Sequence, residues 1–201
     1  MKHAYTLFIL LIGFQFCFGQ SKETEDIISF QNELNKEYLD SLHSPLTAAD
    51  RKNFKGHEFY PIDHKYRVHA KFKRTPDEKP FKMSATRGEP RDYVKYGEIE
   101  FELNSKQFKL NVYQSLVLLK IEAYKDYLFL PFRDFTNDYE TYGGGRFIDL
   151  SIPHMDIIVV DFNKAYNPYC TYNTTFSCPI TPVENFLETD VKAGIKGPKD
   201  H

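Results

Sequence analysis

Strict alternation of apolar and charged side chains is the sequence feature that most constrains the fold. From residue 66 onward, the apolar residues Tyr66, Val68, Ala70 and Phe72 alternate with Arg67, His69, Lys71 and Lys73. Successive side chains of a β-strand point to opposite faces, so this pattern predicts a half-buried strand whose outer face is basic.

A second alternating stretch, residues 98–112, predicts an antiparallel hairpin. Its apolar positions are Ile99, Phe101, Leu103, Phe108, Leu110 and Val112. Asn104 and Ser105 lie between the two halves and make the turn. The outer face of the first strand is acidic and that of the second carries Lys109, and opposite charges across a strand pair help to fix its register.

Further strands are predicted over residues 81–83, 127–132, 147–152, 156–162 and 186–193, and a connection or helical turn over residues 116–124. The β-α-β alternation typical of parallel sheets is missing. About eight short strands at this spacing indicate a mainly β protein, an antiparallel β-sandwich or partly closed β-barrel. An N-terminal α-helix is expected to pack on it.

That helix is predicted over residues 24–42, because Ile27, Phe30, Leu34 and Tyr38 share one helical face. Thr47 and Asp50 have the spacing of a cap for a second, short helix. The domain organisation expected is therefore an N-terminal helical segment over 20–56, a β domain over 57–195 and a disordered tail over 196–201.

Residues 1–19 have the pattern of a signal peptide. Lys2 precedes an apolar run from Leu7 to Phe18, and the small residue Gly19 offers a cleavage point. The run is too short to span a bilayer comfortably. We expect an exported protein, periplasmic or extracellular, with no stable membrane insertion after cleavage; an uncleaved anchor is the alternative.

Removal of the signal peptide also removes Cys17 and leaves Cys170 and Cys178. An even pair of cysteines in an exported chain predicts a disulfide. Closing a loop of this length would stabilise the fold by about 2.5 kcal/mol in the chain-entropy description. The cysteine spacing fits no zinc signature, so no metal is expected.

Charge and histidine placement argue against other cofactors and partners. The net charge of −2 gives no electrostatic reason to expect a nucleic-acid partner. His57, His64 and His69 are close in sequence but not at ligand spacing, and His154 lies in a predicted hairpin tip. No cofactor is predicted.

Three sets of residues are candidates for function. The run Tyr142-Gly-Gly-Gly-Arg146 could hold an anion with its backbone N–H groups and Arg146, or be a flexible turn. A hydrolytic acid pair could come from Asp134, Asp149, Asp161 and Glu184, which could equally cap turns. The segment 161–185 is rich in amides and phenols, which suit a polar ligand or the backbone of a long loop; they are Asn163, Tyr166, Asn167, Tyr169, Tyr172 and Asn185.

Several of these motifs together resemble a prokaryotic family known only as domain of unknown function 1684. The resemblance covers about residues 33–194 and rests on Phe54-Lys-Gly56, Phe59-Tyr-Pro-Ile-Asp63, Tyr142-Gly-Gly-Gly-Arg146, Asp161-Phe-Asn-Lys-Ala-Tyr-Asn-Pro-Tyr-Cys170 and Cys178-Pro with Glu184-Asn185. Family members often continue Ala-Gly-Glu, where this chain has Ile195 after Gly194. The resemblance implies no reaction and no ligand. It implies that Arg146, Asp161, Asn163, Tyr166, Asn167, Cys170, Cys178, Glu184 and Asn185 occupy the family's motif positions.

Three functional hypotheses follow. The first is an exported module that binds a small polar or anionic ligand near the Gly-rich turn and the disulfide-stapled loop. Its expected ligand-binding residues are Arg146, Asp161, Asn163, Tyr166, Asn167, Glu184 and Asn185. The alternatives are a carboxylate-based hydrolase, which requires two carboxyl groups facing each other across a pocket, and an envelope interaction or scaffold protein.

Overall fold

A computed structural model of the chain describes residues 22–198. The predicted signal peptide and the last three residues of the predicted tail lie outside the described residues. Lys196 of that tail is held in place, since its backbone N–H donates to Glu58 O at 2.9 Å. In the described part of the chain, no helix has the length and apolar character needed to cross a membrane.

The N-terminal helix covers residues 22–39, and the other elements follow it in chain order. They are α2 (Ala48–Asn53), η1 (His64–Tyr66), β1 (Arg67–Arg74), β2 (Phe81–Met83), β3 (Arg91–Leu103), β4 (Lys106–Ser115), η2 (Leu118–Lys120), η3 (Glu122–Tyr124), β5 (Tyr127–Asp134), β6 (Arg146–Ser151), β7 (Ile157–Asp161), η4 (Phe162–Lys164), η5 (Tyr169–Thr171), η6 (Val183–Asn185) and β8 (Phe186–Leu187).

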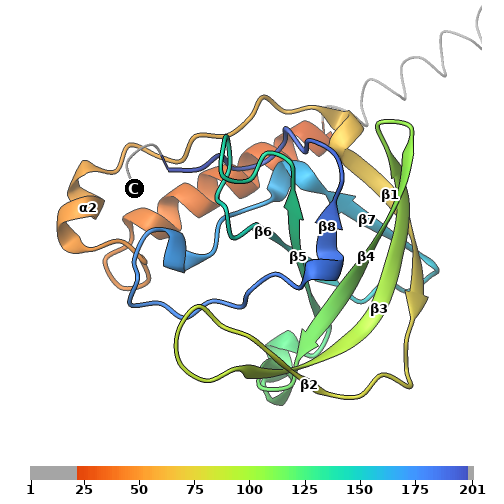
Figure 1. The fold of residues 1–201 in the computed structure, drawn as a ribbon. Coiled ribbons are helices and arrows are strands. Elements are labelled where there is room, and N and C mark those ends of the chain that lie inside the picture. The colour runs from red at the N-terminus through yellow and green to blue at the C-terminus, as the bar shows by residue number, and fades with distance from the viewer. Residues whose placement is uncertain (1–21, 199–201) are drawn as a thin grey trace, which may run out of the picture.

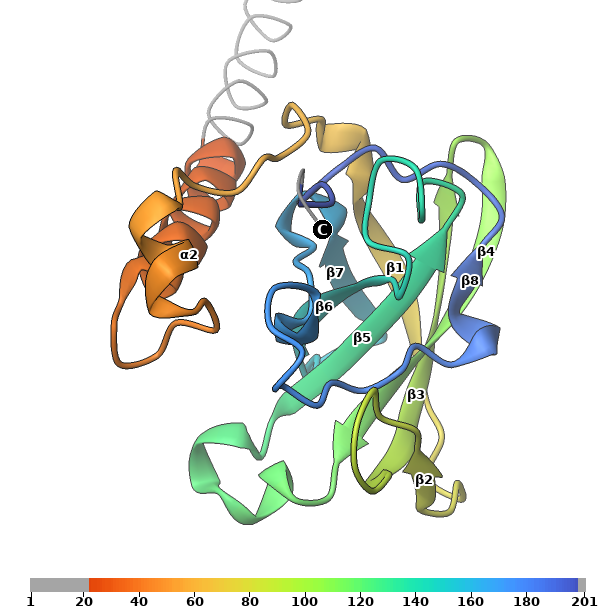
Figure 2. The same cartoon turned by 60° about the vertical axis from the view of Figure 1, so that its left-hand side comes forward.

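The strands form one curled sheet in the order β6-β5-β4-β3-β1-β7, with β2 paired to β3 and the short β8 parallel to β5. The two ends of this path meet, because Phe147 of β6 and Tyr166 beyond β7 exchange backbone hydrogen bonds of 2.9 and 3.0 Å. The expected mainly antiparallel, partly closed barrel is confirmed, and Figures 1 and 2 show it as a half-barrel with the helices on one side.

The predicted hairpin is β3–β4, and its register follows from the alternation in the sequence. Phe101 lies opposite Phe108 and Glu100 opposite Lys109. Apolar residues of both strands therefore enter the core, while the charged residues pair on the outer face. The turn residues Asn104 and Ser105 both have positive φ, as a tight two-residue turn requires.

The N-terminal helix buries the predicted face. Ile27, Leu34 and Tyr38 are buried, and the last two pack with Ile195 and with aromatic side chains of the loop after β7. The helix stops at residue 39, short of the expected end at 42, and Thr47 caps α2 by accepting from Asp50 N at 3.2 Å.

The strand predicted over residues 186–193 ends at Leu187 in the structure, so the prediction is wrong for residues 188–193. The backbone carbonyls of Val191 and Ala193 accept hydrogen bonds from the Arg146 side chain, at 2.8 and 2.5 Å, in place of a neighbouring strand. Leu187, Val191 and Ala193 are all fully buried. They belong to an extended segment, residues 187–193, that packs over the core and that we call the C-terminal strap.

Candidate functional site

Arg146 is a structural residue in the middle of this fold. Its side chain is 0% exposed and its Nη2 donates to Asp134 Oδ2 at 2.8 Å, so the two form a fully buried ion pair. Nη1 and Nη2 also donate to the strap carbonyls named above, and Nη1 donates to Ile195 O at 3.3 Å, whereas the buried Nε has no hydrogen-bond partner among the described residues. Because its side chain is fully buried and bonded to these carbonyls, Arg146 holds the C-terminal strap on the sheet, and Asp134 is committed to the same contact.

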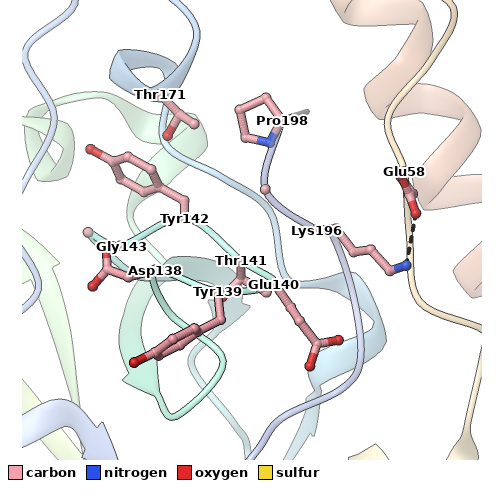
Figure 3. Close-up of a pocket in the computed structure, with 12 residues that line it drawn as sticks. Glu58, Asp138, Tyr139, Glu140, Thr141, Tyr142, Gly143, Thr171, Lys196 and Pro198 are labelled. Carbon is pink, nitrogen blue, oxygen red and sulfur yellow. Dashed lines mark hydrogen bonds and ion pairs between the residues drawn. The ribbon is translucent and has the colours of Figure 1, made fainter. Parts of the chain in front are cut away.

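The Gly-rich turn before Arg146 lines an open cavity of about 780 Å³. Figure 3 shows its walls, with Asp138 beside Gly143, Glu140 on the same loop and Lys196 paired with Glu58 at 2.8 Å. The lining carries three carboxylates and one lysine; Glu140 is paired with Lys192 and Glu58 with Lys196, so among the described residues this cavity offers an anion no unpaired cation. Gly145 is required for packing, because its φ is +93° and a Cβ there would lie 2.5 Å from Phe132 O.

Two asparagines of the predicted loop each form hydrogen bonds with both the backbone N–H and the backbone C=O of one distant residue. Asn163 accepts from Asp63 N and donates to Asp63 O, both at 3.1 Å. Asn185 does the same with Asn111 of β4, at 2.9 and 2.8 Å, and also donates to Pro131 O of β5 at 2.7 Å. β4 and β5 pair with each other only around Tyr113 and Phe129, so the amide of Asn185 replaces backbone pairing where they separate.

Of the remaining candidate residues of the loop, some are buried and bonded within the fold and one is exposed on the surface. Asp161 caps η4 by accepting from Asn163 N at 3.0 Å and pairs with Arg67 at 3.0 Å. Asn167 is buried and donates to Lys196 O at 3.0 Å. Glu184 is exposed in η6. Of the seven predicted ligand-binding residues, Tyr166 lines a cavity of the described chain.

That cavity, of about 440 Å³, lies where the N-terminal helix, the sheet and the loop after β7 meet. Phenylalanine and tyrosine are the commonest residues of its wall, and we call it the aromatic cavity. It is lined by Phe30, Leu34, Glu37, Arg91, Tyr93, Leu118, Tyr127, Phe129, Phe147, Asp149, Tyr166, Pro168, Tyr169, Ser177, Cys178 and Pro179. Phe129 and Phe147 pack edge to face with ring centroids 4.7 Å apart, which fixes the floor.

Asp149, one of the four predicted acids, is the polar centre of the aromatic cavity. Tyr127 Oη and Tyr166 Oη both donate to its Oδ1, at 2.8 and 2.6 Å. No described residue donates a hydrogen bond to Oδ2, so this oxygen is available to a ligand. Burial raises the pKa of Asp149, against the lowering effect of the two phenol hydrogen bonds. By its solvent-accessible surface, however, Asp149 is an exposed residue of β6, so its carboxylate also meets solvent.

Glu37 supplies a second carboxylate from the N-terminal helix. Tyr169 Oη donates to Glu37 Oε1, and this contact joins the helix to η5. Burial is the main effect that raises the pKa of Glu37; the charge of Asp149 adds to it and His43 opposes it. The charge of Asp149 thus acts on Glu37 across one cavity. Arg91, exposed at the rim, is the one cation of the wall and donates to Ser177 O at 3.0 Å.

The sequence indicated Asp149 and Tyr166 but missed Glu37, Tyr127 and Arg91. Glu37 directly precedes the buried Tyr38, on a helix whose other acids are exposed or form surface ion pairs. Nothing in the local sequence therefore distinguishes Glu37 from these surface acids. Only the crossing of the helix over the β5–β6 edge brings Glu37 and Asp149 together.

The histidines stay outside the aromatic cavity. His57 lies among the rings of Tyr38, Phe54 and Tyr172, and burial lowers its pKa to about 4. His64 contacts Thr24 Oγ1 at 2.9 Å. No group of three or more metal-ligating side chains occurs within residues 22–198.

Cys170 and Cys178 lie side by side next to the aromatic cavity. Both are thiols in this structure, and Cys170 N donates to Cys178 Sγ at 3.3 Å. The disulfide therefore stays a prediction, although the structure places the two cysteine side chains next to each other.

Comparison with known proteins places this fold in a family. The model of the family described as "Protein of unknown function (DUF1684)" matches residues 52–196. The chain is also similar to an uncharacterised protein from gene locus rrnAC0354 of Haloarcula marismortui, solved by solution NMR, with a TM-score of 0.71 and 27% identity over 91% of this chain and 98% of that one. No curated protein matches the chain. With the family match spanning most of its length, the chain belongs to the DUF1684 family of proteins of unknown function.

Proposed function

We propose that the protein binds a small organic cation, a protonated amine on an apolar or aromatic body, in the aromatic cavity. The observation that carries this proposal is the arrangement around Asp149, where two phenols hold Oδ1 and leave Oδ2 for a donor in the cavity. Aromatic faces attract cations through their quadrupoles, and a charge-assisted hydrogen bond to a carboxylate adds to this attraction.

Electrostatics favour a cation over the anionic ligand expected from the sequence. The wall carries two carboxylates against one guanidinium. Both carboxyl groups have raised pKa values, so their ionisation is costly in the free protein and is compensated when a cation enters. Binding should therefore release protons when the pH lies near these raised pKa values. Affinity should fall as pH decreases through these raised pKa values, because the neutral acids attract a cation less.

Ligand-observed NMR tests the charge preference directly. Phenethylamine, 2-phenylethanol and phenylacetate present the same ring with a cation, a neutral hydroxyl and an anion. Saturation transfer to phenethylamine that exceeds transfer to the other two, and that is lost with Asp149→Asn, is the expected result. Equal transfer to all three, or a preference for phenylacetate, would overturn the proposal.

A carboxylate-based hydrolase is the second candidate, favoured by the two interacting carboxyls with raised pKa values. The pair differs from the four predicted acids, since Glu37 takes the place of Asp134, Asp161 or Glu184 as the partner of Asp149. One carboxyl would act as the general acid while the other stays ionised. Turnover of nitrophenyl glycosides that is abolished by both Glu37→Gln and Asp149→Asn would support it, and no turnover would exclude these substrates.

We also propose that the protein is exported, on the pattern of residues 1–19. Fractionation of cells that express the full chain, with N-terminal sequencing of the product, tests this. Cleavage after Gly19 is the expected result, and an uncleaved cytoplasmic product would contradict it.

A further inference from the structure

The two cysteines beside the aromatic cavity differ in exposure and in what they are attached to. Cys178 is 8% exposed and lines the cavity, whereas Cys170 is half-buried. Cys178 is fixed to the segment after β2, since its N–H donates to Thr86 Oγ1 at 3.0 Å and its carbonyl accepts from Thr86 N at 2.9 Å. Cys170 belongs to η5, the turn that also carries Tyr169.

The surroundings of Cys170 favour its thiolate. The two cysteines are in direct contact, since Cys170 N donates to Cys178 Sγ at 3.3 Å. Interaction with the Cys178 side chain is the main reason why the pKa of Cys170 falls to about 6, and Thr86 and Tyr142 also lower it. The same contact, together with burial, raises the pKa of Cys178. An accessible sulfur that ionises easily beside a buried, protonated partner is the arrangement that thiol–disulfide exchange requires.

We propose that Cys170 and Cys178 are a thiol–disulfide exchange site whose substrate is a small-molecule or protein disulfide. The Cys170 thiolate attacks one sulfur of the substrate and forms a mixed disulfide, and the first thiolate of the substrate leaves. Cys178 then loses its proton to water and attacks Cys170 Sγ, which releases the second thiolate. The two protein thiols are oxidised by two electrons, and the substrate disulfide is reduced to two thiols.

Oxidation at this site would tighten one wall of the aromatic cavity. The disulfide would link η5, with Tyr169 on Glu37, to the segment that follows β2. A ligand would then meet a wall that is already ordered, so the oxidised protein should bind phenethylamine several-fold more tightly than the reduced one. This effect on affinity rests on the proposed function, whereas the thiol chemistry does not.

Thiol trapping in the Cys17→Ser background tests the exchange chemistry. The reduced protein is treated with limiting iodoacetamide near neutral pH, and peptide mass spectrometry measures the label on each cysteine. Cys170 should react first. The substitution Cys178→Ala, which leaves no side-chain donor at this position, should slow Cys170 by about tenfold, because Cys170 returns toward its ordinary pKa. Faster labelling of Cys178, or an unchanged rate for Cys170 in C178A, would overturn the proposal.

Incubation with oxidised glutathione tests the product. The wild-type pair should end as an intramolecular disulfide, and Cys178→Ser should stop at a glutathione adduct on Cys170. An adduct on Cys178, or no reaction in the folded protein, would contradict the assignment. Because Cys178 is buried, Cys170→Ser serves as the milder second variant, and it should leave Cys178 unreactive. Thermal melts show that each variant is folded.

Discussion

The Tyr166 phenol donates a 2.6 Å hydrogen bond to Asp149 Oδ1 and thereby ties the loop after β7 to the edge strand β6 inside one cavity. The backbone of Tyr166 also pairs with that of Phe147, two residues before Asp149. Tyr166 is therefore held on β6 through both its backbone and its hydroxyl group. Burial and the charge of Asp149 raise the pKa of Tyr166, which therefore stays a donor. The contact positions the carboxylate and leaves Oδ2 without a hydrogen-bond donor among the described residues.

Neutralising Asp149 should stabilise the protein. Its folded pKa is raised, so the folded state holds its proton to higher pH than the unfolded state does, and stability falls as pH rises from the ordinary value of 3.8 through the raised one. Asp149→Asn removes the charge and keeps an oxygen acceptor for both phenols. Calorimetry should show a higher melting temperature near neutral pH and no gain below the ordinary pKa. A lower melting temperature near neutral pH would contradict this account.

Breaking the Arg146–Asp134 pair should cost about 3–5 kcal/mol, because Arg146→Met leaves a buried carboxylate without a partner. Urea denaturation measures the free energy of unfolding. The double variant Arg146→Met with Asp134→Asn should recover part of the loss, since the amide keeps an oxygen acceptor for Thr136 N without a charge. A single variant as stable as wild type would show that Arg146 is not structural.

The amide of Asn185 should matter far more than the neighbouring carboxylate of Glu184. Asn185→Ala removes three hydrogen bonds and leaves the partner groups of Asn111 and Pro131 buried, with an expected loss of about 3 kcal/mol. The matched control Glu184→Ala is exposed and should change stability by less than about 0.5 kcal/mol. Hydrogen exchange should locate the loss at β4 and β5, and a uniform, small change would contradict the bridging role.

His57 should make the protein sensitive to acid. Its pKa is lowered from 6.5 to about 4 by burial, so the unfolded state binds the extra proton first as pH falls. Stability is full above pH 6.5 and is lost progressively down to about pH 4, by on the order of 3 kcal/mol. His57→Gln should flatten the pH dependence of unfolding in this window. An identical pH profile for wild type and variant would show that His57 ionises freely in the folded protein.

The sequence predicted the sheet well because alternation dictates both burial and register. The strands β1, β5, β6 and β7 appear where the pattern placed them, and the hairpin β3–β4 includes the predicted residues 98–112 but extends to Arg91 and Ser115. The pattern failed over residues 188–193. Buried and exposed residues alternate there too, but the backbone carbonyls bond to the Arg146 side chain instead of to a neighbouring strand. Period-two burial indicates extended backbone, and it does not show what accepts the backbone hydrogen bonds.

The candidate site was only partly predictable. The amides of Asn163, Asn167 and Asn185 suit a ligand and a peptide group equally well, and the fold uses them for peptide groups. Asp149 was one acid among four, and its partner Glu37 comes from a helix far away in the chain. The aromatic cavity exists only because that helix crosses the curled sheet, a relationship that local patterns do not encode.

The dissociation constant of phenethylamine, measured by calorimetry near neutral pH for wild type, Asp149→Asn and the control Glu184→Gln, tests the central claim most directly. If Asp149 Oδ2 receives the ammonium group, Asp149→Asn should weaken binding by about tenfold or more, and Glu184→Gln should bind as wild type does. Equal affinity for wild type and Asp149→Asn, or no measurable binding to any of the three, would contradict the account.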